Sequence, residues 1–248
     1  MNEKLVYAIL SYGDRYKEEY LLKYSNDELL RNWLEALKFF FGRAFYQGRR
    51  DDVSGKVQDA AIGVIEHNSS IVNGNLEDND LDILKKELQE KIGKGKIGKA
   101  RDVEMVISAL QYVRRLPNLN IVAHSIQRID ACEISKHYQE LQKSLNKTGI
   151  VQVGPKIASF YLRDVVSLFQ LENLVSYDFQ FCLQPVDVWV RRLAKIGIVQ
   201  NNATDEEIQK AIVKLCNELH CSPLKFNQGA WYAGYHSFDL LLENLKKI

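Results

Sequence analysis

The chain has 248 residues, of which 46% are hydrophobic and 26% are charged, and its formal net charge is +1. This composition is ordinary for a globular protein with a substantial core, and no stretch approaches the roughly 20 apolar residues of a membrane-spanning helix. The four cysteines are too scattered for a disulfide framework or for a four-thiolate iron–sulfur cluster. The first residues lack the features of a secretory signal, so we expect a cytoplasmic protein.

Apolar residues recur at helical spacing along most of the chain, and only four prolines interrupt it. Ser25 begins a capping box that predicts a helix through Phe41, and Thr204 begins a second capping box. We therefore expect an all-α fold, with room for a short strand or two near the N-terminus. Further helices are expected at 55–67, 79–92, 100–115, 119–130, 133–146, 156–170, 187–196 and 225–246.

The segment 144–160 has the pattern of two helices joined by a tight hairpin. Gly149 suits the end of the first helix, and Pro155 suits the first turn of the second. Backbone N–H groups around Gly154 would then face solvent at a helix N-terminus, which is a site for an anion such as a DNA phosphate. Lys156 lies in the first turn of the second helix, where its amine can act as a nucleophile or, as a plain surface lysine, bind phosphate or solvent.

Asp187 is the second candidate catalytic residue. Pro185 favours an extended segment before it, and the sequence that follows is helical, so Asp187 is expected at a helix N-cap. An ionised carboxylate there could stabilise a positively charged sugar and accept a proton from an attacking group. The alternative is a purely structural cap.

Together, Val153-Gly154-Pro155-Lys156 and Pro185-Val186-Asp187 resemble the motifs of the helix-hairpin-helix DNA glycosylases. The resemblance extends from Leu145 to Arg192. It implies a single glycosylase domain over 1–248, with two helical lobes, an active site in the cleft between them, and the hairpin motif at about 137–170. By resemblance to the bifunctional branch of the family, Lys156 of this chain would attack the sugar C1′, expel the base and form a Schiff base that permits β-elimination. Asp187 would be the essential carboxylate.

Two departures refine this resemblance. Gln152 replaces the first glycine of the Gly-Val-Gly turn that is usual in the family. The interval from Lys156 to Asp187 is longer than in common members, and the segments 171–182 and 222–234 are similar to the archaeal type of 8-oxoguanine DNA glycosylase. The lack of a cysteine cluster argues against the endonuclease III branch.

The resemblance also suggests residues that would contact DNA. Phe160 and Trp231 are expected to stack on an everted purine, and Asn227 is expected to hydrogen-bond its edge, although each could instead belong to the core. Basic residues are concentrated between 91 and 101, a run that is also typical of a solvated surface. The predicted contacts to the DNA backbone are Gln152, Gly154 and Arg191.

The sequence therefore predicts a monomeric, nucleoid-associated repair enzyme that removes 8-oxoguanine from double-stranded DNA and cleaves the resulting abasic site. No cofactor or metal ligand is expected, apart from a monovalent cation that hairpin carbonyls could hold. The alternatives are a glycosylase for an alkylated or deaminated base, a non-catalytic helix-hairpin-helix DNA-binding protein, and a helical interaction protein with no role on DNA.

Overall fold

The computed structural model describes residues 3–46 and 50–245, with side chains up to residue 236. The described chain is helical and contains no strand, only an isolated bridge between Gln142 and Ile150, so the predicted all-α class is confirmed. The prediction of a short strand or two near the N-terminus is wrong for the described residues. Residues Glu3–Tyr16 form helix α1, because Val6, Ile9 and Leu10 recur at helical spacing and are all buried.

The chain separates into two compact units. Unit 1 comprises Met1–Ser25, Ile129–Ser135 and Leu162–Ile248, and unit 2 comprises Asn26–Arg128 and Lys136–Tyr161. Helix α10 (Pro155–Leu168) begins in unit 2 and ends in unit 1.

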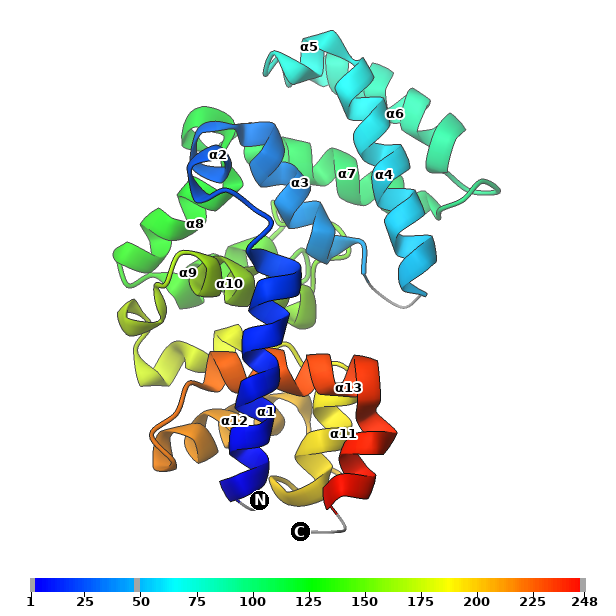
Figure 1. Ribbon diagram of the computed structural model, residues 1–248. Coiled ribbons are helices and arrows are strands. Elements are labelled where there is room, and N and C mark those ends of the chain that lie inside the picture. Colours follow the sequence, from blue (N-terminus) through cyan, green and yellow to red (C-terminus); the bar gives the residue numbers. More distant parts are fainter. Residues whose placement is uncertain (1–2, 47–49, 246–248) are drawn as a thin grey trace. The chain divides into compact units, whose positions relative to one another are not determined.

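Unit 1 is built around the pairing of α1 with the last helix, α13 (Pro223–Leu245), which lie side by side (Figure 1). Two glycines allow their backbones to approach closely. A Cβ atom at Gly229 would lie 1.9 Å from the carbonyl oxygen of Ile9, and one at Gly13 would lie 2.4 Å from that of Lys225. The remaining elements of unit 1 are η1 (Lys17–Leu21), η3 (Glu172–Leu174), η4 (Tyr177–Leu183), α11 (Val188–Gly197) and α12 (Asp205–Glu218).

The core of unit 1 joins apolar side chains from these four α-helices. Ile9 of α1, Leu193 of α11, Ile212 of α12 and Phe226 of α13 belong to one buried cluster. This cluster fixes α11, and with it the segment that carries Asp187.

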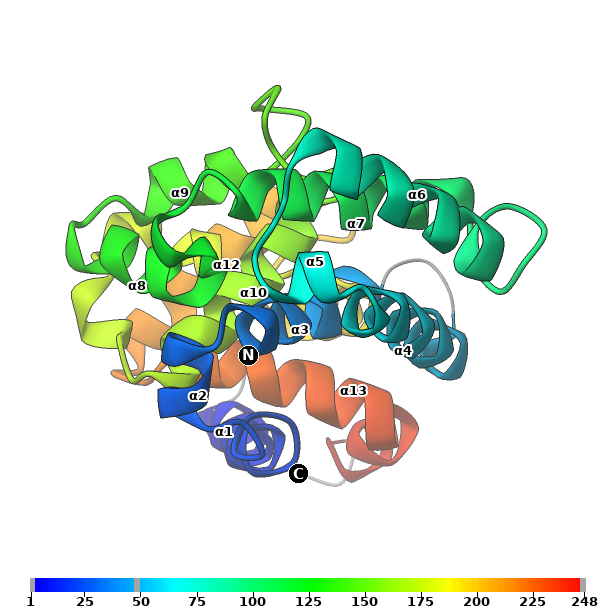
Figure 2. The same cartoon turned by 90° about the horizontal axis from the view of Figure 1, so that it is seen from above.

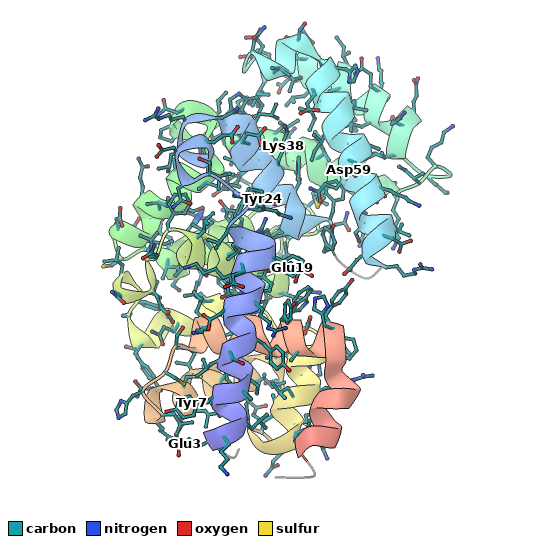
Figure 3. The ribbon with its side chains drawn as sticks, viewed as in Figure 1. Glu3, Tyr7, Glu19, Tyr24, Lys38 and Asp59 are labelled. Carbon is teal, nitrogen blue, oxygen red and sulfur yellow. The ribbon has the colours of Figure 1, made fainter. Side chains whose placement is uncertain are left out.

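Unit 2 begins with α2 (Asn26–Arg31) and α3 (Trp33–Ala44), and α3 supplies three consecutive buried phenylalanines at 39–41. Helix α6 (Asp78–Ile92) packs against α4 (Asp51–His67) and α7 (Ala100–Val113), as Figure 2 shows. On the surface of this unit, Lys38 extends from α3 (Figure 3) and pairs with Glu35 and Glu66, both at 2.6 Å. The other elements are α5 (Ser69–Val72), η2 (Pro117–Leu119), most of α8 (Ile121–Asp130) and α9 (Ile134–Leu141), and the first half of α10.

Two predicted helix boundaries require correction. The single helix expected from Ser25 to Phe41 is broken at Asn32, whose side chain accepts hydrogen bonds from the N–H groups of Leu34 and Glu35 and so begins a new helix. The helix expected over 133–146 ends at Leu141, where the chain enters the hairpin. The capping box at Thr204 is confirmed, since its side chain and that of Glu207 bond each other's backbone N–H groups.

None of the described helices is both long enough and apolar enough to cross a membrane.

Candidate functional site

The hairpin between α9 and α10 is held by backbone hydrogen bonds. The N–H of Ile150 donates to Leu141 O at 3.0 Å, and the N–H of Lys143 donates to Val153 O at 3.3 Å. The hydroxyl of Ser108, on α7, accepts the N–H of Val151 at 2.9 Å. The segment is therefore a fixed loop anchored on α7 within unit 2.

The two glycines of the hairpin, Gly149 and Gly154, have different structural roles. A Cβ at Gly149 would lie 2.6 Å from the backbone carbonyl of Gln142, so the hairpin fold itself requires this glycine. A Cβ at Gly154 would meet no atom within 4 Å, and the backbone there does not adopt a left-handed conformation. The fold thus does not require glycine at 154, and the open space leaves room for a group from outside the protein to approach the backbone.

Gln152 adopts a left-handed conformation, with φ of 66°. This is the position at which a glycine is usual in the family that the motif resembles. A non-glycine residue there costs about 1 kcal/mol, so the turn is retained in a conformation that glycine would adopt with less strain. The Nε2 of Gln152 is buried and has no hydrogen-bond partner among the described residues.

Lys156 is the second residue of α10 and is half-buried. Its amine forms no hydrogen bond or ion pair with the described residues of unit 2. Phe160 lies one turn further along the same helix and is also half-buried. The first two turns of α10 therefore carry both residues of unit 2 that were predicted to act on the sugar or the base.

The hairpin is basic. Residues 141–156 include Lys143, Lys147 and Lys156 and no acidic residue, and the first two are exposed. Arg115 of unit 2 donates to the carbonyl of Thr148 at 2.6 Å and brings a further positive charge to the hairpin. Such a surface attracts a phosphate backbone.

Asp187 is the N-cap of α11, as predicted. Its Oδ1 accepts the N–H of Trp189 at 2.9 Å and of Val190 at 2.8 Å, and the side chain is half-buried. Two N–H donors and the helix N-terminus favour the ionised carboxylate.

The segment before Asp187 is held by two buried amides. Gln209 of α12 donates to Gln184 O at 2.8 Å, and Asn227 of α13 donates to Pro185 O at 3.2 Å. The position of the carboxylate thus depends on side chains from two helices of unit 1.

Asn227 belongs to a closed network of buried polar groups. Its Oδ1 accepts from Arg163 at 2.9 Å, and Arg163 also donates to Asp164 and to the hydroxyl of Tyr16. That hydroxyl in turn donates to Asp164 at 2.9 Å. Asn227 is 0% exposed, and both Oδ1 and Nδ2 of its amide bond within unit 1, so it supports the segment before Asp187, and its contact to a base stays a prediction.

Trp231 is half-buried and belongs to an aromatic cluster on unit 1. Its ring stacks on that of Tyr235 with centroids 5.0 Å apart and planes 6° apart, and its edges meet Tyr16 and Tyr20 at 5.5 and 5.4 Å. Burial, aided by Glu19, raises the pKa of Tyr20 well above its ordinary value, so this phenol is uncharged at neutral pH. The cluster offers flat apolar surface on which a base could stack.

Arg191, predicted to contact the DNA backbone, forms an ion pair with Asp205 at 2.5 Å. Both side chains are more than a third exposed, so water screens the pair and Arg191 can exchange this partner for a phosphate at little cost.

Sequence reasoning missed two features of the site. Tyr235 follows Trp231 at a spacing of four residues on one helix, which was a usable signal for a shared aromatic face. Arg163 and Asp164 interrupt an apolar helix, and two adjacent charges in such a run indicate a buried ion pair.

Lys156 belongs to unit 2 and Asp187 to unit 1, so their convergence on one sugar stays a prediction. Comparison of the chain with protein-family models, curated proteins and solved structures found no match.

Proposed function

We propose that the chain is a DNA N-glycosylase that removes an oxidised purine, 8-oxoguanine, and cleaves the abasic site by β-elimination. The observation that carries the proposal is Lys156, whose amine stands on the first turn of a helix directly after a tight, basic backbone hairpin. A lysine at a phosphate-binding turn is placed to reach the sugar attached to that phosphate.

The hairpin supports binding to duplex DNA. Gly154 leaves its backbone open on the side where a Cβ would project, and the neighbouring lysines supply positive charge. A phosphate held there would position the strand without reading its sequence. Carbonyl groups of the same turn could hold a monovalent cation between the protein and the phosphate.

The proposed reaction uses Lys156 as the nucleophile and Asp187 as the supporting carboxylate. The neutral amine of Lys156 attacks C1′ as the bond from C1′ to the base breaks, and the base leaves with the bonding electron pair and takes up a proton. Loss of a proton from the nitrogen and opening of the sugar ring give a Schiff base, which permits loss of the C2′ proton and departure of the 3′ phosphate. The carboxylate of Asp187 would stabilise the positive charge on the sugar and accept a proton during these steps.

The base would be held by aromatic side chains. Trp231, backed by Tyr235, supplies an apolar surface on unit 1, and Phe160 of unit 2 is the second residue expected to stack on the base. A flipped purine needs such flat surfaces on which to stack. An alkylated or deaminated base would use the same surfaces, so the choice of lesion is the finer part of the proposal.

A cleavage assay on a panel of duplexes tests the proposal. Each duplex carries 8-oxoguanine, uracil, hypoxanthine or an alkylated adenine, and wild type is compared with Lys156→Gln and Asp187→Asn. We expect wild type to cleave at 8-oxoguanine and both variants to lose at least about 100-fold in rate. Lys147→Gln, which removes an exposed lysine of the same hairpin, is the matched control and should retain the chemical step.

Two results would contradict the proposal. Cleavage of a different lesion, with none at 8-oxoguanine, would contradict the assigned substrate but not the proposed mechanism. Salt-dependent duplex binding with no cleavage of any lesion would identify a non-catalytic DNA-binding protein.

A further inference from the structure

A second group of polar side chains lies in unit 2, on helices α8 and α9. His124 of α8 and His137 and Glu140 of α9 each present a ligand atom, and these atoms lie within 4.8 Å of one another. The two imidazole rings are nearly perpendicular, with centroids 5.2 Å apart. Two imidazoles and one carboxylate are a common ligand set for divalent transition metals.

Ser125 holds the ring of His137 through Nε2. Its hydroxyl oxygen lies 2.7 Å from Ile121 O, 2.9 Å from the hydroxyl of Tyr161 and 2.8 Å from Nε2 of His137. When the single hydroxyl proton of Ser125 goes to Ile121 O, Nε2 of neutral His137 carries the ring proton and Nδ1 has a lone pair that can bind a metal.

No described residue donates a hydrogen bond to that lone pair. Nδ1 of His137 is buried and forms no hydrogen bond among the described residues, and the side chain is 0% exposed. Oε2 of Glu140, itself an acceptor, lies 3.8 Å from Nδ1 of His137. In this tautomer two acceptors face each other, which is unfavourable for the buried nitrogen unless a cation lies between them.

The groups around the three side chains match those that orient metal ligands. Ser125 bonds the ring of His137 through Nε2, and Arg128 donates to Oε1 of Glu140. Histidine and carboxylate ligands of metals are commonly held by such outer hydrogen bonds.

We propose that His124, His137 and Glu140 form a binding site for one divalent transition-metal ion of the zinc class. His124 is half-buried, which gives the ion a path from solvent and leaves a fourth position for water. The ion would join α8 to α9, the helix that leads into the hairpin. Its role is structural, because no ligand belongs to the proposed catalytic residues.

Zinc titration of the chelator-treated, full-length protein tests this site without DNA. Calorimetry should show one equivalent of Zn²⁺ bound, a higher melting temperature in its presence, and no comparable effect of Mg²⁺. Co²⁺ in place of zinc should give visible absorption bands typical of tetrahedral coordination. We expect His124→Gln and Glu140→Gln to weaken zinc binding by at least about 100-fold, and Ser125→Ala to weaken it about 10-fold or more.

Two control variants exclude other zinc ligands. His67→Gln removes an exposed histidine of the same unit, and Cys221→Ser removes a free thiol, so both should bind zinc as wild type does. Because His124 is half-buried, His124→Gln should fold, and circular dichroism checks this. The proposal is overturned if wild type binds no zinc, if His124→Gln binds it unchanged, or if the cysteine variant abolishes binding.

Discussion

Replacing Asn227 by alanine tests whether this side chain supports the fold or reads the base. The change removes the acceptor of the Arg163 guanidinium and the donor to Pro185 O. It leaves one buried charged donor and one buried carbonyl unsatisfied. A buried polar group without its partner costs about 1–3 kcal/mol, so Asn227→Ala should lower the free energy of unfolding by about 2–4 kcal/mol.

Urea denaturation followed by tryptophan fluorescence measures this loss, because Trp189 and Trp231 both lie in unit 1. Asn217→Ala is the matched control. It deletes the same amide from an exposed position of α12 and should change the free energy of unfolding by no more than about 0.5 kcal/mol. If Asn227→Ala unfolds at the wild-type urea concentration while its activity on lesion-bearing DNA falls, the supporting role is refuted and the amide acts on the base.

Three further predictions follow from the geometry. Gly154→Ala should leave the melting temperature unchanged, because the added methyl group meets no protein atom. It should weaken duplex binding about 10-fold or more in a titration, because the methyl group blocks the approach of a phosphate; unchanged binding would contradict this. Gly229→Ala should destabilise unit 1 by about 3 kcal/mol or more in calorimetry through its clash with Ile9 O, whereas Gly63→Ala, in open space within α4, should stabilise by about 0.5–1 kcal/mol. Hydrogen bonds from Thr204 lower the pKa of the Glu207 carboxyl below its ordinary value of 4.5. The stabilisation of the fold by the ionised carboxylate is therefore present above pH 4.5 and is lost as the pH falls through the lowered pKa. Glu207→Gln removes this titration, so the melting temperature of the variant should fall less steeply at acid pH.

Local signals in the sequence predicted much of the fold. Thr204 and Glu207 lie three residues apart and form their capping box whatever the rest of the chain does, and Asp187 caps α11 in the same way. The break at Asn32 was missed because apolar residues continue at helical spacing on both sides of it, so the periodicity gave no sign that a second helix begins there.

The polar network behind Asp187 could not be predicted, because its partners are distant in sequence. Arg163 meets Tyr16 and Asn227, which are separated from it by 147 and 64 residues. Only the fold brings them together. The sequence indicated Asn227 as a polar residue of the candidate site, but its burial depends on the packing of α13 against α1, which only the fold shows.

The pairing of His124 with His137 was not predicted for a related reason. The two residues lie on different helices, and only Glu140 is at helical spacing from His137. A spacing of three residues between a histidine and a glutamate is common on helix surfaces and indicates a metal only when a third ligand is nearby.

Borohydride trapping with peptide mapping tests the central claim most directly. The enzyme is incubated with a duplex that contains 8-oxoguanine, the Schiff base is reduced, and the cross-linked peptide is identified by mass spectrometry. We predict a covalent adduct on the peptide that contains Lys156, no adduct for Lys156→Gln, and an adduct for Lys147→Gln. An adduct on any other lysine, or an adduct that persists in Lys156→Gln, would contradict the assignment of the nucleophile.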